Sequence, residues 1–306
     1  MQALDIIKET VNKALDDKVP RLAAALSYYS IFSIAPLVLI VVAVAGTVFG
    51  QDAASGVLAG QLESSIGANA ALAVQEMVAR MRTPSTNLLA SLTGIVLLVV
   101  GATGVFAALQ DALNTVWGIK PKPGRVVVSL LRDRFRSFSM ILGIGFLLLT
   151  SLILTTTLQI ASGVIARVVH VPAAVWSLLG SVISFLVVTV LFAAIFKVLP
   201  DAKIEWKDVR FGAVLTALLF VVGRYVLGWY LGRESTASVY GSAGSLVLIL
   251  LWVNYSSLIL LFGAEFTQVH ARSRGRDIHP NSTAERVAHA SDPQPERAAP
   301  ASAPLA

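Results

Sequence analysis

Charged residues are absent from five long stretches of the chain, at 22–51, 83–110, 137–166, 168–196 and 235–264. A sixth stretch, 211–232, is interrupted only by Arg224. A bilayer core of about 30 Å needs about 20 apolar residues in a helix, and runs such as GIVLLVVGATGVFAAL lack the alternation of a membrane β-barrel. The pattern predicts an all-α integral membrane protein with six transmembrane helices, at about 24–50, 88–117, 137–166, 174–198, 211–232 and 244–268.

The segments outside these spans carry weaker patterns. In residues 1–21, apolar side chains recur at helical spacing on one face (Leu4, Ile7, Val11, Leu15 and Val19). They predict an amphipathic helix that either lies in the cytoplasmic membrane interface or packs under the bundle. Residues 52–87 hold two shorter amphipathic patterns, which predict external helices between the first two spans. The transmembrane domain then covers 22–270, and residues 271–306, rich in Ala, Pro and Ser, are expected to form a disordered cytoplasmic tail.

Lysine and arginine indicate the orientation. They are dense before the first span, in the second-to-third and fourth-to-fifth connections, and after the sixth span. The opposite connections hold only Arg80, Arg82, Arg167 and Arg233. Both termini are therefore expected to face the cytoplasm.

Composition agrees with a membrane location, since the 306 residues are 56% hydrophobic and 14% charged. The net charge of +6 comes from basic residues at helix ends, where they meet anionic lipid. We therefore expect membrane lipids, and no nucleic acid, as partners. The absence of cysteine excludes disulfides and thiol chemistry.

Three ionisable side chains, Asp111, Arg224 and Glu265, lie within the predicted spans, and such residues are functional candidates. Asp111 and Glu265 are candidates for coupling transport to protons. Glu265 shares a sector of its helix with Asn254, Ser257 and Gln268. This polar stripe is expected to face other helices or a cavity rather than lipid.

Arg224 lies towards the outer end of the fifth span. It can meet Asn254 or Tyr255 of the sixth span, or it can extend to the interface, so a substrate contact and a structural role both stay open. The sixth span opens with YGSAGS, whose free helix N-terminal amides attract anions; a loop with an ordinary helix cap is the alternative. The candidate substrate-binding residues are Arg224, Asn254, Tyr255, Ser242, Ser245 and Arg233.

Small residues predict where helices pack closely. Gly101 and Gly104 lie on one stripe of the second span, which turns polar at Asp111, and Gly228 and Gly232 form a GxxxG pair. Pro36 is expected to kink the first span. Three serines in the first span, at spacings of three residues, indicate either helix packing or the wall of a polar cavity: Ser27, Ser30 and Ser33.

Three ordered blocks carry a resemblance to a known family. LAAALSYYSIFSIAPL in the first span, LQDALNTVWG at 109–118 and GSAGSLVLILLWVNYSSLILLFGAEFTQ at 241–268 resemble the YihY/BrkB family of bacterial inner-membrane proteins, formerly called ribonuclease BN. The resemblance covers roughly residues 5–270. It implies the bacterial inner membrane as the location and leaves the activity open.

The motifs of enzymes are missing from the sequence. The four histidines are scattered, and no HExxH motif, phosphate-binding loop or metal-spaced cluster occurs. We therefore expect no enzyme, no cofactor and no metal. The leading hypothesis is translocation of a lipid or another amphipathic or anionic substrate in envelope biogenesis, without an ATPase of its own. The alternative is a non-transporting membrane scaffold that recruits envelope-biogenesis protein partners.

Overall fold

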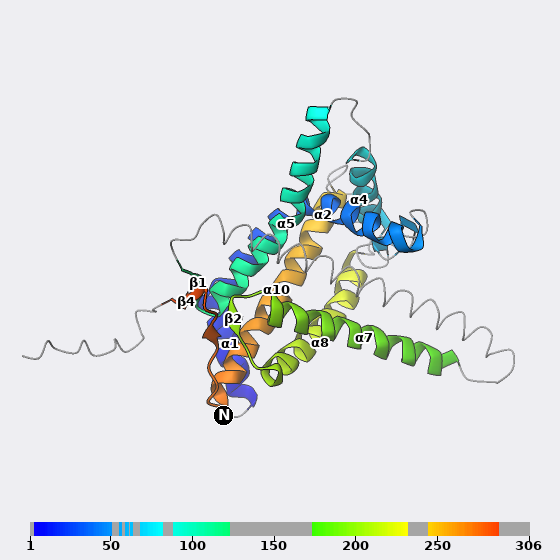
Figure 1. Cartoon of the computed structure of the whole chain (residues 1–306). Coiled ribbons are helices and arrows are strands. Elements are labelled where there is room, and N and C mark those ends of the chain that lie inside the picture. Colours follow the sequence, from blue (N-terminus) through cyan, green and yellow to red (C-terminus); the bar gives the residue numbers. More distant parts are fainter. Residues whose placement is uncertain are drawn as a thin grey trace, which may run out of the picture.

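The computed structural model describes residues 3–50, 55–56, 59–60, 62–63, 68–81, 88–122, 173–231 and 244–287. Within these residues the chain is mostly helical (Figure 1). The helices are α1 (Ala3–Asp16), α2 (Val19–Phe49), α4 (Ala68–Met81), α5 (Leu88–Val116), α7 (Ala173–Val198), α8 (Trp206–Leu231) and α10 (Gly244–Ser273). Four short strands complete the structure: β1 (Ile119–Pro121), β2 (Ala202–Lys203), β3 (His279–Pro280) and β4 (Ala284–Arg286).

Four helical segments among the described residues are long and apolar enough to cross a membrane, at Val19–Val42, Leu178–Val198, Trp206–Leu227 and Leu246–Ser273. They coincide with the predicted first, fourth, fifth and sixth spans. The 29-residue helix α5 occupies the predicted second span, and the predicted third span, at 137–166, lies outside the described residues. The chain is therefore a helical membrane protein, while the count of six spans and the orientation remain predictions.

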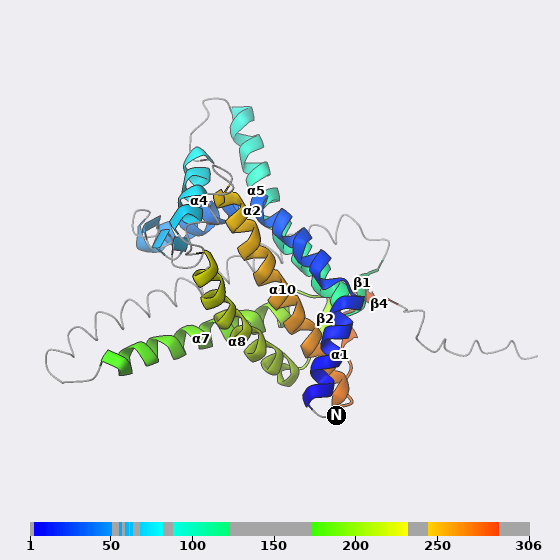
Figure 2. The ribbon, with the colours of Figure 1, turned by 180° about the vertical axis from the view of Figure 1, so that it is seen from behind.

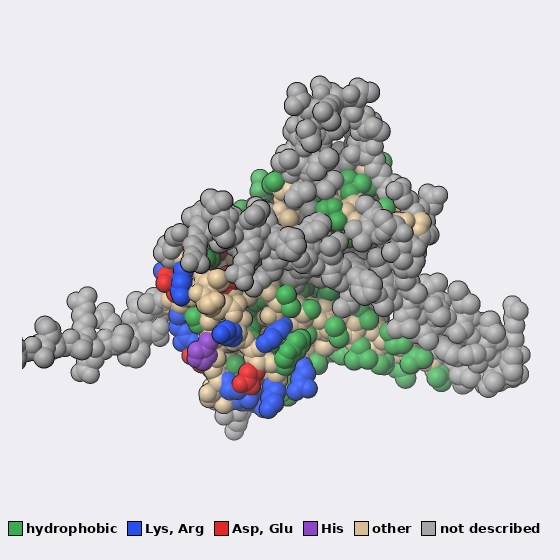
Figure 3. Space-filling model, in the orientation of Figure 1, with side chains coloured by type: hydrophobic (Ala, Val, Ile, Leu, Met, Phe, Trp, Pro, Cys, Tyr) green, Lys and Arg blue, Asp and Glu red, His purple; other side chains and the backbone are tan. Residues whose placement is uncertain are grey.

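The outer faces of α7 and α8 are apolar, as expected of helices that contact lipid. Large hydrophobic side chains on both are more than one third exposed, among them Leu178, Leu186, Val190, Leu218 and Val222. Figure 3 shows green hydrophobic side chains along α7, whereas blue Lys and Arg side chains gather at the lower end of the molecule. That lower end, where α1, the C-terminal end of α10, the start of α8 and the four strands meet, is called the polar end below.

Helix α10 is central, because it packs against α1, α2, α4, α5 and α8. Helix α2 packs mainly against α5 and α10, and α7 packs against α8. Figures 1 and 2 show α1 beside the C-terminal end of α10, and α4 beside the opposite ends of α2 and α10. There α4 buries Ala71, Val74 and Val78, so this predicted external helix caps the bundle with its apolar stripe.

Small residues mediate the contact between α2 and α5, as predicted. A Cβ atom at Gly101 would lie 3.0 Å from the Pro36 side chain, and one at Gly104 would lie 3.5 Å from Ser33 Oγ. Helix α2 continues through Pro36. The proline and the facing glycine therefore fit one another at the point where the two backbones approach.

A second close contact joins α8 to α10 by two reciprocal Gly–Thr pairs. A Cβ atom at Gly212 would overlap Thr267 Oγ1, and one at Gly263 would overlap Thr216 Oγ1. Each threonine hydroxyl donates to the glycine carbonyl four residues earlier in its own helix, at 2.7 Å. The buried hydroxyls are thereby satisfied. This pairing was not predicted; of the predicted pair, Gly232 and the surroundings of Gly228 lie outside the described residues.

The segment that follows α10 differs from the predicted disordered tail as far as residue 287. β3 pairs antiparallel with β2, and β4 pairs antiparallel with β1. Ile278 and Ala284 are buried in the main hydrophobic core. The composition of the tail concealed this fold, because two apolar side chains and a few backbone hydrogen bonds are enough to dock the segment on an existing core. Residues 288–306 lie outside the described residues.

Candidate functional site at the junction of α1 and α10

The polar end is built on a buried core that holds several helices together. Leu113, Val116 and Trp117 from α5 and its C-terminal turn pack with Phe196 of α7 and Leu261 of α10, and the Trp117 and Phe196 rings meet edge to face at 6.4 Å between centroids. The Trp117 indole donates to the Ala264 carbonyl at 3.1 Å. The LQDALNTVWG block therefore anchors α5 to α10 beside Glu265.

The same block holds a buried polar group that sequence reasoning missed. Gln110 Nε2 and Asn114 Nδ2 donate to Asp201 Oδ2 at 2.9 and 3.1 Å, and the Asp201 amide donates to Asn114 Oδ1 at 2.9 Å. All three residues are buried. The signal was present in the sequence, since Gln110 and Asn114 stand four residues apart on a face lined with apolar residues.

The polar stripe of α10 faces inward, as predicted. Ser257, Glu265 and Gln268 are buried, while Asn254 is partly buried. Because these side chains are covered by neighbouring helices rather than by lipid, the stripe forms contacts within the bundle.

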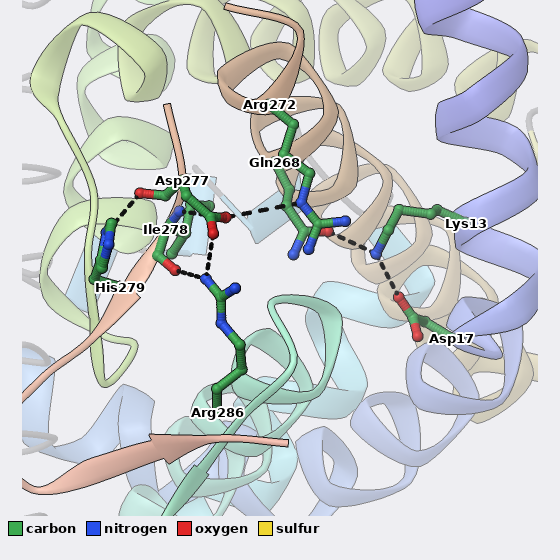
Figure 4. A network of polar contacts seen from close by, with 8 residues as sticks. All are labelled: Lys13, Asp17, Gln268, Arg272, Asp277, Ile278, His279 and Arg286. Atoms are coloured by element: carbon green, nitrogen blue, oxygen red, sulfur yellow. Dashed lines mark hydrogen bonds and ion pairs between the residues drawn. The ribbon is translucent and has the colours of Figure 1, made fainter. Parts of the chain in front are cut away.

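Helix α1 docks on this stripe through its own polar side. Lys13 Nζ donates to Gln268 Oε1 at 2.8 Å and lies 3.5 Å from Asp17 Oδ2, as Figure 4 shows. Thr10, on the same side, is fully buried. The apolar side points outward, with Leu4 61% and Leu15 63% exposed. This arrangement is the reverse of an amphipathic helix in water and fits surroundings of lipid.

Glu265 lies at the centre of this junction. Its side chain is 0% exposed, and neither carboxylate oxygen accepts from a donor among the described residues. The Asp17 carboxyl group is close enough to share a hydrogen bond with Glu265 only if one of the two acids carries a proton. The charged groups that act on it are Asp17 and Lys13 of α1 and Arg272 of α10. A buried carboxylate without donors is costly in free energy. Among the described residues Ser256 Oγ and His270 Nε2 are also buried without a partner, but Glu265 is the only acid in this condition.

A second layer of ion pairs locks the end of α10 to α8 and to the strands. Arg276 Nε donates to Asp208 Oδ2 at 3.0 Å, and Arg286 donates to Asp277 Oδ2 at 2.7 Å (Figure 4 shows the latter). Burial acts to raise the pKa of Asp277, but the hydrogen bond from Arg286 and the charges of Arg286 and Arg272 outweigh it, so that pKa lies below its usual value. The hydrogen bond to Asp208 raises the pKa of Arg276.

An apolar groove of about 390 Å³ opens beside the junction. Its walls come from α1, the start of α2, α8 and α10, and its lining residues are Val11, Ala14, Leu15, Val19, Pro20, Leu219, Leu258, Ile259 and Phe262. Lys18 and Arg21, which flank Val19 and Pro20 in the chain, are both exposed. The groove can therefore hold an apolar chain next to positive charge.

In the described part of the chain, Arg224 does not pair with Asn254 or Tyr255. Arg224 is exposed on α8, beside the exposed Tyr225 and Val226, and has no ion-pair or hydrogen-bond partner among the described residues. Tyr255 instead packs over Gly223, the neighbouring position on α8, about 100° around the helix. The structure therefore separates Arg224 from the polar stripe and favours extension towards the interface.

The remaining predicted residues fall in three places. Ser27 and Ser33 are buried and Ser30 is partly buried; Ser27 Oγ donates to the Ala23 carbonyl at 2.9 Å, which fits helix packing. Ser242 and Arg233 lie outside the described residues, as does the side chain of Ser245. Asp111, expected on a packing face, is exposed, because at this end α5 turns Gln110, Asn114 and Trp117 to its neighbours.

Metal ligands do not gather anywhere in the part of the chain that the structure describes, where no group of three His, Asp or Glu side chains could hold an ion.

The fold and site thus define a helical membrane protein with a charged, buried junction at one end. Its family follows from comparison: the family described as Virulence factor BrkB matches residues 10–288, so the chain belongs to this family, also called YihY/BrkB, as the three sequence blocks predicted.

The relatives are membrane proteins of the same kind. The chain is 28% identical to a UPF0761 membrane protein of Saccharophagus degradans, with 90% of this chain and 62% of the relative covered. It is 27% identical to one of Haemophilus influenzae, with 82% and 89% covered. The chain therefore spans less than two thirds of the first relative and most of the second. No solved structure matches the chain.

Proposed function

We propose that the protein translocates an amphipathic anion, in particular an anionic lipid, across the bacterial inner membrane without an ATPase of its own. In this proposal both termini face the cytoplasm, six helices span the membrane, and the polar end marks the cytoplasmic leaflet. The observation that carries it is the apolar groove of about 390 Å³ between α1, α8 and α10, beside which Lys18 and Arg21 are exposed at the start of α2.

The chemistry of the groove suits such a substrate. Its lining residues are all apolar, so an acyl chain can enter without covering a polar group of the protein. Lys18 and Arg21 are exposed at the start of α2, where they can pair with a phosphate or carboxylate headgroup. Basic residues at a helix end also set the topology of a membrane protein. Headgroup binding by Lys18 and Arg21 is therefore tested with separate variants below.

Liposomes that contain the purified protein and a fluorescent anionic phospholipid test the proposal. The readout is the fraction of dye that an external quencher reaches, compared with empty vesicles. We expect excess quenching with the wild-type protein. Its absence would exclude unaided movement of this lipid and favour the alternative, a scaffold that recruits envelope-biogenesis partners.

Two neighbouring leucines on α8 offer a matched pair of variants. Leu219 lines the groove, whereas Leu218 does not and is 52% exposed. Leu219→Trp fills the groove and should slow quenching about tenfold, which corresponds to about 1.4 kcal/mol. Leu218→Trp should leave the rate unchanged. Equal rates in both variants would show that the substrate does not pass through the groove.

Variants of the basic residues test whether Lys18 and Arg21 bind the lipid headgroup or only add positive charge to the surface. The double change Lys18→Gln and Arg21→Gln should slow movement of an anionic lipid more than that of a zwitterionic one, and Lys207→Gln serves as an exposed control.

Arg224→Ala tests the remaining hypothesis that Arg224 contacts the substrate. Because Arg224 lies on the exposed side of α8, we expect nearly normal lipid movement in this variant. A complete loss of lipid movement would mean that Arg224 contacts the substrate.

A further inference from the structure

Glu265 does not line the groove. It is the side chain of the polar end with the most buried polar atoms lacking a hydrogen-bond partner among the described residues. Its side chain is fully buried and both oxygens lack a donor among the described residues. Two other buried polar groups of the polar end are engaged: Gln268 accepts from Lys13, and Asp201 accepts from Gln110 and Asn114. His270 Nε2 is the other unpartnered buried atom of this end among the described residues, but it belongs to a ring that can be neutral. An isolated buried carboxylate is unfavourable, and an added proton removes the charge.

Asp17 is the acidic neighbour that acts on Glu265, and the two come from different helices. With both carboxyl groups ionised, two like charges would face one another at the junction, with Lys13 already paired to Asp17 at 3.5 Å. Arg272, the other cation that acts on Glu265, is shared with Asp277. One proton on the pair leaves a balanced Lys13–Asp17 ion pair and a neutral Glu265, and like-charged carboxyl groups are known to share a proton in this way.

The position of the pair connects it to the groove. Phe262, which lines the groove, is three residues before Glu265, and Ala14 and Leu15, on the other wall, are followed closely by Asp17. Lys18, between α1 and α2, has a left-handed backbone with φ of 55°. The two helices break at this residue, next to Asp17, and α1 on one side of the break carries one wall of the groove.

We propose that Glu265 and Asp17 form a proton-binding site that holds α1 against α10 when one proton is bound and releases α1, widening the groove, when that proton leaves. The proton reaches water through Asp17, whose side chain is 16% exposed, because Glu265 itself has no exposed atom. The inference rests on the proposed function only in treating the groove as the substrate path. The ligand of the site is a proton, and the control it exerts is on α1.

Infrared spectroscopy of the purified protein in lipid nanodiscs, without substrate, detects the proton directly. A protonated carboxyl group has a carbonyl stretch separate from the carboxylate bands. We expect such a band in the wild type, its loss in Glu265→Gln, and its retention in Glu285→Gln, which removes an acid that is paired with Lys120 and whose side chain is 40% exposed. A band that Glu265→Gln leaves unchanged would overturn the proposal.

Spin-label distances test the movement, and the absence of native cysteine allows clean labelling. Labels at Lys8→Cys on α1 and Lys207→Cys on α8 report on the groove, and labels at Lys207→Cys and Ser282→Cys report on two parts outside α1. All three positions are exposed. From acidic to alkaline buffer, the first distance should lengthen and the second should stay constant.

Variants of the pair decide the cause of any movement. Glu265→Gln and Asp17→Asn each prevent the two like charges, so both should keep α1 docked at every pH. Asp17→Asn also covers the case in which Glu265→Gln does not fold. A wild-type distance that is independent of pH, or an unchanged pH response in either variant, would overturn the proposal. Lipid movement does not enter these measurements, so the two proposals can fail separately.

Discussion

Two buried acids at the polar end differ sharply in their surroundings. Asp201 is 6% exposed and is held by Gln110 and Asn114, whereas Glu265 is 0% exposed and has no hydrogen-bond donor among the described residues. Both lie within the same bundle, close to the same core. The difference teaches that burial alone says little about a buried acid, because Asp201 is held by two amide donors and Glu265 by none among the described residues.

The largest expected effect comes from breaking the satisfied acid. Asp201→Ala leaves the Gln110 and Asn114 amides buried without an acceptor, which should lower the free energy of unfolding by roughly 2–5 kcal/mol. Thermal unfolding in detergent measures the loss. Asp111→Ala is the control, since Asp111 is exposed on the same helix, and a similar loss there would contradict this interpretation.

Removing the unsatisfied acid should act in the opposite direction. Glu265→Gln keeps the size of the side chain and removes a buried group that ionises, so we expect stability in alkaline buffer to stay the same or to rise by about 1 kcal/mol. The measurement is thermal unfolding in detergent, as for Asp201. The control is Gln268→Ala, which removes the acceptor of Lys13 and should lower the free energy of unfolding. A clear loss of stability in Glu265→Gln would mean that the carboxylate is structurally required.

The smallest effect is expected for an exposed acid, Asp277, whose side chain is 44% exposed. Its pKa in the folded protein lies below the usual value, so its ion pairs stabilise the fold above the pKa of the unfolded chain and are lost as the pH falls through the folded pKa. The contribution of such an exposed pair is below about 1 kcal/mol. Asp277→Asn should therefore flatten the acidic part of the stability curve, and an unchanged acidic limb would show that the pair contributes nothing.

Some elements of the site could be predicted and others could not. The stripe on α10 was predictable, because Ser257, Glu265 and Gln268 share one face of a helix whose other faces are apolar. The Gly101–Pro36 contact was predictable in part, since small residues indicate a close approach without naming the partner. The Gly–Thr pairs of α8 and α10 depend on the register between two helices, which periodicity in one helix does not contain.

The polar residues show the same limit. The depth of Arg224 along its helix allowed a contact with Asn254 or Tyr255 as well as extension to the interface. Depth does not determine rotation about the helix axis, and Tyr255 packs over Gly223. The docking of residues 274–287 was hidden because strands this short have no periodicity of their own. They form because β1 and β2 present unpaired backbone groups beside an existing core.

The sequence by itself determined that this is a helical membrane protein of the YihY/BrkB family. It also determined the positions of most of the described spans and the face of α10 that is polar. These features follow from local rules, namely the length of apolar runs, the helical repeat and three sequence blocks. Only the tertiary structure decided that α1 turns its polar side to α10, that Asp201 is satisfied and Glu265 is not, and that a groove opens beside them. Each of these depends on which side chains from distant parts of the chain fill the space around a group, and local sequence does not specify that.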